Sequence, residues 1–124
     1  MEKLSKISVF LKALATQHEA VAFRDVIALI EEQYDYTPVA FINGNVRNPP
    51  GQNEGSCKIL AFAKLQGLSP EQTLHCFGHY YRDDVLKRPQ GDDHANIRQF
   101  MQTGWAGVQF ETMPLTKKAG SASI

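Results

Sequence analysis

The sequence predicts a mainly α-helical domain of about five helices, with a short two-stranded β ribbon and a long ordered loop rich in Asn and Gly. Apolar residues recur at three- and four-residue steps in several segments, which is typical of amphipathic helices. Only two short stretches have the β-branched and aromatic content of strands. The loop, residues 41–58, is long for a connection in a small domain and lacks the charges of a solvated linker. An α+β fold is the alternative.

The length and composition indicate one domain. We assign residues 1–116 of the 124 to this domain and residues 117–124 to a disordered C-terminal tail. Lysine and arginine together number 13, as do aspartate and glutamate, and the zero net charge argues against a nucleic-acid partner. No apolar run reaches the length of a membrane span, so we expect no membrane partner. We expect a monomer.

The cysteine usage indicates the compartment. Two cysteines do not make a disulfide framework, and the start of the chain lacks the layout of a secretory signal. These features predict a cytoplasmic protein whose thiols stay reduced.

Helix boundaries follow from capping residues and helix breakers. Ser69 can cap a helix that begins at Pro70, and Gln72 completes a capping box. Ser56 is the expected cap of the helix that follows the loop. The first helix is expected at about residues 2–16, and the second runs from Phe23 until Thr37-Pro38 breaks the pattern. The other three are expected from Cys57 to Gln66, from Pro70 to just before Pro89, and from Ala95 to Thr103.

Two short segments are the candidate strands. Val39–Ile42 is expected to pair with Val108–Phe110. Asn43-Gly44 follows the first strand and favours a turn, because both residues tolerate positive φ.

Gly78 lies inside the predicted fourth helix, where glycine costs about 1 kcal/mol relative to alanine. We therefore expect another backbone segment, such as the Asn/Gly loop, to pack against it. His94, Asn96 and Arg98 could cap and bridge that loop. A buried loop needs partners for its backbone groups, so a structural polar network is the favoured interpretation.

Three kinds of functional site are also conceivable: a nucleophile, an anion-binding site and a metal site. Cys57 would be a nucleophile if the positive end of a helix stabilised its thiolate and His94 or His79 lay nearby. Gly51, Gly55 and Ser56, with Lys58, could bind an anion on backbone N–H groups.

The third kind is a metal site. His75, His79 and Asp83 share one face of the predicted fourth helix and could act as ligands. No second Cys or His pair defines the geometry, so we predict neither a metal nor another cofactor.

The motifs resemble those of the HopJ type III effector family. The resemblance rests on F-x-N-G-x-x-x-N-x-x-G-x-N-x-G-S-C-K (41–58), F-G-x-Y-Y-R (77–82), H-x-N-I-R-x-F (94–100) and G-W-x-G-x-x-F (104–110). It implies a small bacterial protein, possible export by type III secretion and no assigned reaction. The amphipathic start of this chain differs from the unstructured, Ser-rich signals of exported effectors, so a bacterial household role is equally expected.

We therefore predict a small binding module with a polar pocket for a small anionic ligand or a peptide, and leave open whether it is an enzyme. The alternatives are a hydrolase or transferase that uses Cys57 with His94, and a purely structural interaction domain. The expected pocket residues are Asn43, Asn48, Asn53, Lys58, Tyr80, Arg82, His94, Asn96 and Arg98.

Overall fold

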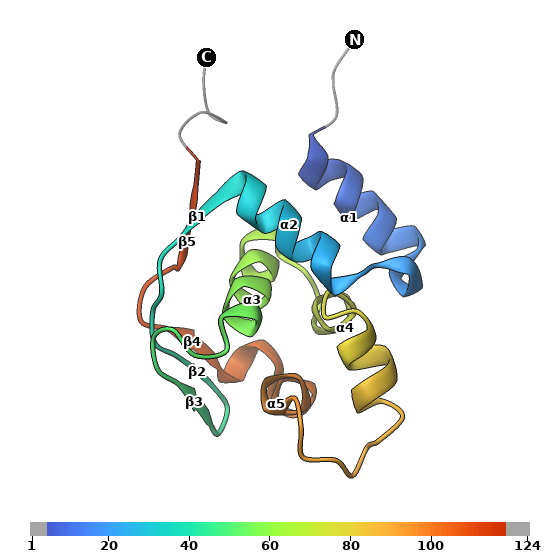
Figure 1. Ribbon diagram of the computed structural model, residues 1–124, viewed down its shortest axis with the longest axis vertical. Coiled ribbons are helices and arrows are strands. Elements are labelled where there is room, and N and C mark those ends of the chain that lie inside the picture. Colours follow the sequence, from blue (N-terminus) through green and yellow to red (C-terminus); the bar gives the residue numbers. More distant parts are fainter. Residues whose placement is uncertain (1–4, 119–124) are drawn as a thin grey trace.

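The computed structural model describes residues 5–118 and has a mainly helical architecture (Figure 1). The helices are α1 (Lys6–Thr16), η1 (His18–Ala20), α2 (Phe23–Gln33), α3 (Glu54–Gln66), α4 (Pro70–His75), η2 (Tyr80–Val85), α5 (Ala95–Thr103) and η3 (Gly104–Gly107). The strands are β1 (Tyr34–Tyr36), β2 (Phe41–Asn43), β3 (Val46–Asn48), β4 (Val108–Phe110) and β5 (Leu115–Lys117). The predicted class, mainly α with a small β component, is confirmed.

The β structure is larger than the sequence predicts. β2 pairs with β4 as expected, with Phe41 opposite Phe110, but β3 also pairs with β2, so this ribbon has three strands rather than two. The extra strand forms because Gly44, at φ 58°, turns the chain straight back on itself. β1 and β5 form a separate antiparallel pair.

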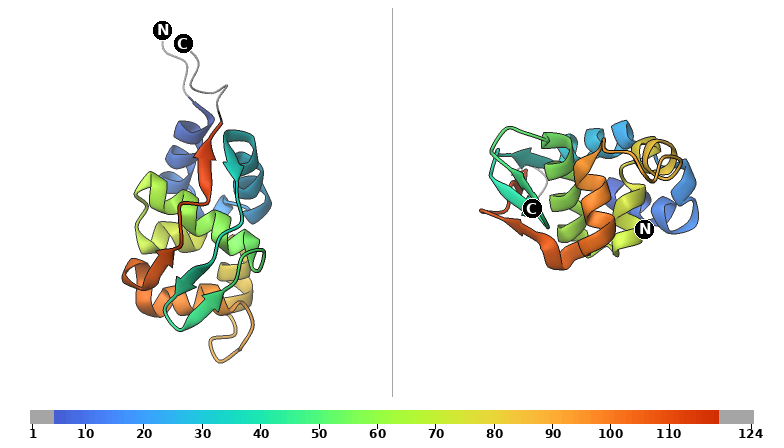
Figure 2. Two further views of the ribbon diagram at one scale, coloured as in Figure 1. Left: turned by 90° about the vertical axis from the view of Figure 1, so that its left-hand side faces the viewer. Right: turned by 90° about the horizontal axis from the view of Figure 1, so that it is seen from below.

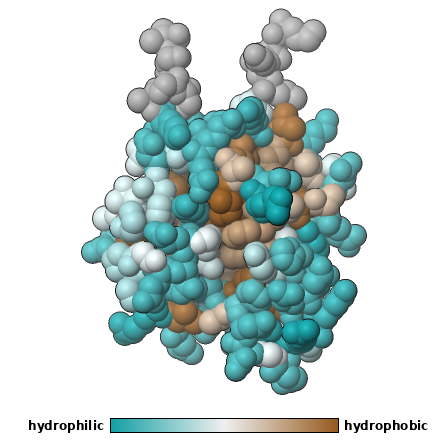
Figure 3. All heavy atoms as spheres, in the orientation of Figure 1, coloured by the Kyte–Doolittle hydropathy of each residue, from teal (hydrophilic) through white to brown (hydrophobic). Residues whose placement is uncertain are grey.

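The core is built around α3. Its residues from Ile59 to Ala63 are all fully buried, and a helix that is apolar on every side needs neighbours on every side. Figure 2 shows α3 between the strands and the remaining helices. On the face seen in Figure 3, hydrophobic side chains form a strip with hydrophilic residues on both sides.

The prediction of a single continuous fourth helix is wrong. The capping box at Ser69 starts α4 as expected, but α4 ends at His75 and a separate π-helical segment, η2, follows. The break lies at Gly78, which has φ 62° and therefore cannot continue a right-handed helix. A backbone segment does pack against Gly78, but it is Ala22–Phe23 and not the Asn/Gly loop.

The helix after the loop starts earlier than predicted. Its N-cap is Asn53 rather than Ser56, so Ser56 belongs to the first turn and Cys57 follows it. At the C-terminal end, Thr116 and Lys117 belong to β5, and residues 119–124 of the predicted tail lie outside the described residues. Within residues 5–118, no helix combines the length and apolar character needed to cross a membrane.

Candidate functional site

Four asparagines form a hydrogen-bonded network between the loop and α5. Asn43 Nδ2 donates to the Asn96 backbone oxygen at 2.9 Å and to Asn96 Oδ1 at 3.1 Å. Asn48 Oδ1 accepts from Asn96 Nδ2 at 2.9 Å and from Asn53 Nδ2 at 2.7 Å. Asn96 therefore joins α5 to β2 and β3 directly, and to the start of α3 through Asn48. A structural polar network is what the sequence favours, but of His94, Asn96 and Arg98 only Asn96 bridges to the loop in the described part of the chain.

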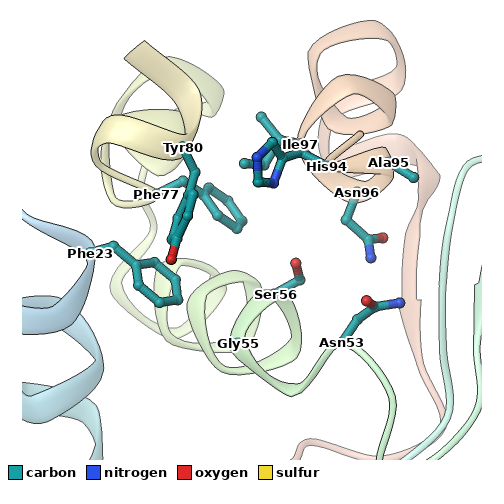
Figure 4. A pocket seen from close by; sticks show the side chains of 10 residues that line it. All are labelled: Phe23, Asn53, Gly55, Ser56, Phe77, Tyr80, His94, Ala95, Asn96 and Ile97. Atoms are coloured by element: carbon teal, nitrogen blue, oxygen red, sulfur yellow. The ribbon is translucent and has the colours of Figure 1, made fainter. Parts of the chain in front are cut away.

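The network divides the predicted binding residues into two groups. Asn43 and Asn48 are almost completely buried, at 0% and 2% exposure, and their side chains hold the loop. Asn53 and Asn96 also line a cavity between α3, α5 and η2 (Figure 4). Only the second pair is therefore placed to meet a ligand.

The cavity has a volume of about 430 Å³ and two unlike walls. Rings of Phe23, Phe77 and Tyr80 form one wall, and the side chains of Asn53 and Asn96 lie across from it (Figure 4). The Ser56 hydroxyl and the His94 ring are directed into the space between these two walls. Sequence reasoning missed the two phenylalanines. Phe77 was expected in the core, and no sequence signal links Phe23 to this loop.

His94 is held by acidic neighbours. Its Nε2 lies 3.0 Å from Asp84 Oδ2 and 3.7 Å from Asp93 Oδ2, and its ring centroid is 5.2 Å from that of Tyr80. Asp84 and Tyr80 both come from η2, and π-helical segments are frequent at functional sites. Sequence reasoning did not select Asp84, because only the π-helical turn brings it to His94.

Two helices begin at the cavity in an unusual way. Asn53 is the N-cap of α3 and His94 is the N-cap of α5, and among residues 5–118 these are the two non-glycine residues with positive φ, at 53° and 52°. A left-handed conformation costs an ordinary residue about 1–2 kcal/mol. Neither side chain caps its own helix, so both first turns keep N–H groups available beside the cavity.

The three cationic residues predicted to line the pocket make other contacts. Lys58 pairs with Glu31 at 3.0 Å and lies over the Tyr36 ring, 4.7 Å from its centroid. Arg82 donates to the backbone oxygens of His18, Val21 and His75, and so ties the η1–α2 connection to α4.

Arg98 serves the loop before α5. It donates to the backbone oxygens of Arg88 and Asp93 at 2.8 and 2.6 Å, and its guanidinium hydrogen bond lowers the pKa of the Asp93 carboxyl. None of Lys58, Arg82 and Arg98 lines the cavity.

Cys57 lies in an environment that opposes thiolate formation. It is 1% exposed, it does not line the cavity, and burial raises the pKa of its thiol to about 11. The expectation of a thiol at the positive end of the helix fails because α3 begins at Glu54, one turn earlier in the chain. The structure does not bring Cys57 and His94 together at this cavity.

The residues of the metal hypothesis lie apart. His75 is buried against His18 and Arg82, His79 is exposed, and Asp83 pairs with Lys87 at 3.3 Å. The break at Gly78 separates His75 from the other two. Within the described part of the chain, no group of three His, Cys, Asp or Glu residues could hold a metal ion.

Comparison with known proteins supports the resemblance seen in the motifs. The structure is similar to the crystal structure of the unknown function protein VPA0580, with 52% sequence identity and a TM-score of 0.89, over 94% of this chain and 97% of that chain. No curated protein matches the chain. The family model described as HopJ type III effector protein matches residues 7–115, and the chain therefore belongs to the HopJ family.

Proposed function

We propose that this protein is a binding module that takes a small anionic ligand in the cavity between α3, α5 and η2. The observation that carries the proposal is the start of two helices, α3 and α5, at one cavity without side-chain caps. First-turn N–H groups and the helix dipole both favour a negative charge there. The Ser56 hydroxyl supplies a further donor for a carboxylate or a phosphate. Because His94 Nε2 faces Asp84 at 3.0 Å, the His94 ring donates to an anion from Nδ1–H in its protonated form.

The aromatic wall indicates the rest of the ligand. Phe23, Phe77 and Tyr80 offer apolar surface opposite the polar groups, so a ligand with an anionic group and an apolar or planar body fits both walls. A volume of about 430 Å³ is in the range of small-molecule sites.

The family name adds a prediction about location. Residence in the bacterial cytoplasm stays the predicted location, and membership of the HopJ family supports release through a type III secretion system, with a role as an effector, as the alternative. The peptide ligand and the monomeric state also stay predictions.

Ligand titration tests the binding proposal. Phenyl phosphate, benzoate and inorganic phosphate are titrated into the ¹⁵N-labelled protein at fixed ionic strength, and amide shifts report binding. We expect saturable shifts around Ser56 and Ala95, and tighter binding of the two aromatic anions. Ser56→Ala removes the hydroxyl donor, and His94→Asn replaces the imidazole, which can carry a positive charge, by a shorter neutral amide. Each variant should weaken binding about tenfold. Asparagine is chosen at residue 94 because it tolerates positive φ.

The control is Ser8→Ala, which changes the third residue of α1, the position that Ser56 occupies in α3. It should bind all three anions as the parent does. Melting temperatures and circular dichroism confirm that every variant folds. Absence of saturable shifts with all three anions, or equal binding in the parent and both site variants, would overturn the proposal.

A further inference from the structure

A second hollow adjoins the proposed binding cavity. It has a volume of about 520 Å³ and lies along the start of α2. Phe23 and Tyr80 line both hollows, so the two spaces meet at this aromatic pair. The rings pack edge to face, with centroids 5.1 Å apart and planes at 78°. A ligand that crosses the pair would therefore contact apolar ring surface between two more polar ends.

The aromatic pair is held in place by its surroundings. The Phe23 backbone packs against Gly78, two residues before Tyr80 in the chain. The rings of His79 and His94 flank Tyr80, at centroid distances of 4.2 and 5.2 Å. Such a preorganised ridge costs little conformational entropy when a ligand binds across it.

The second hollow carries a cation without a partner. Arg24 lines this hollow and is exposed, and its guanidinium makes no ion pair or hydrogen bond with any residue among 5–118. The nearby carboxylate of Glu31 is already paired with Lys58 at 3.0 Å. Arg24 is therefore free to bind an acidic group, and Ile27 and Ala28 provide apolar surface beside it.

We propose that the natural ligand is elongated and carries two acidic groups, one bound in the first cavity and the other at Arg24, with an apolar middle over Phe23 and Tyr80. The inference rests on the proposed function and narrows its ligand class. Arg24 becomes the residue that distinguishes a ligand with two acidic groups from one with a single anionic group.

A series of linear carboxylates tests the proposal. The α,ω-dicarboxylates from succinate to sebacate are titrated beside monocarboxylates of equal chain length, with amide shifts as the readout and fixed ionic strength. We expect one range of dicarboxylate lengths to bind about five- to tenfold tighter than the matched monocarboxylate, as an added charge-assisted contact predicts. Arg24→Ala should remove this advantage and leave monocarboxylate binding unchanged.

The control and the outcomes keep the two proposals separate. Arg47→Ala removes the same charge from the exposed middle position of β3 and should keep the dicarboxylate advantage. Equal binding of both series in the parent, or an advantage that survives Arg24→Ala, overturns the two-group ligand while the anion cavity stands. If neither these carboxylates nor the aromatic anions bind, the cavity proposal itself fails.

Discussion

The backbone of Gly78 lies directly against the backbone of Phe23. A Cβ atom on Gly78 would be 2.6 Å from the Phe23 amide nitrogen and 3.4 Å from the Ala22 carbonyl carbon. This contact joins the α4–η2 junction to the start of α2, and it brings Phe23 and Tyr80 together at the edge of the cavity. One glycine therefore determines both the break in the predicted fourth helix and the position of the aromatic wall.

Replacing Gly78 with alanine should destabilise the protein more than the same change at Gly67. Both glycines have positive φ, 62° and 69°, so both variants pay about 1–2 kcal/mol for the left-handed conformation. Only at Gly78 would the new methyl group also meet backbone atoms, since nothing lies within 4 Å of the corresponding site on Gly67. Urea denaturation should show an additional loss of at least about 1 kcal/mol for Gly78→Ala. Equal losses of stability in the two variants would mean that the backbone of Phe23 moves away from the new methyl group at little energetic cost.

Removing Asn96 should destabilise the fold as a whole. Asn96→Ala removes three side-chain hydrogen bonds, to Asn43 Nδ2, Asn48 Nδ2 and Asn48 Oδ1. Asn43 keeps the backbone oxygen of residue 96 and Asn48 keeps Asn53, so the loss is that of net hydrogen bonds, each worth about 0.5–1.5 kcal/mol. We expect a loss of about 2–4 kcal/mol in the free energy of unfolding, measured by urea denaturation. Asn45→Ala, an exposed asparagine in the same loop, should change stability by less than about 0.5 kcal/mol. A loss near zero for Asn96→Ala would show that the network does not hold the loop.

Both cysteines should resist alkylation in the native protein. Burial raises the pKa of Cys57 to about 11 and that of Cys76 to about 12, and the thiolate is the reactive form. Iodoacetamide at neutral pH should therefore modify neither thiol until urea unfolds the chain, as mass spectrometry can follow. Rapid native modification of Cys57 would revive the hypothesis of a Cys57 nucleophile.

Mild acid should lower the free energy of unfolding through protonation of His75. Burial, followed by the charges of His18 and Arg82, lowers the pKa of His75 in the folded state. The unfolded chain therefore binds a proton first as the pH falls below about 6.5, and the free energy of unfolding should decrease from there towards lower pH.

The His75 effect can be isolated with two variants. Urea denaturation at several pH values between about 5 and 7 should show a smaller slope for His75→Gln than for the parent. His79→Gln, which changes an exposed histidine, should keep the parental slope. An unchanged slope in His75→Gln would place the acid sensitivity elsewhere.

The sequence by itself determined the features that depend on neighbours along the chain. Apolar spacing identified the helical segments, the Ser69 capping box marked the start of α4, and Asn43-Gly44 marked the turn between β2 and β3. These signals are local because helix caps and tight turns are made within a few residues. The family motifs, which are read directly from residue identity, also needed no structure.

Only the tertiary structure decided which polar residues face the cavity. Lys58, Arg82 and Arg98 are equally able to bind a ligand anion, a carboxylate of the protein or a backbone oxygen. Lys58 and Arg82 find Glu31 and His18, which are distant in the sequence, and Arg98 binds the loop just before its own helix. Asp84 reaches His94 only because the Gly78 backbone contact with Phe23 ends α4 and a π-helical turn follows. Side-chain partners are a property of packed elements, and no spacing along the chain encodes them.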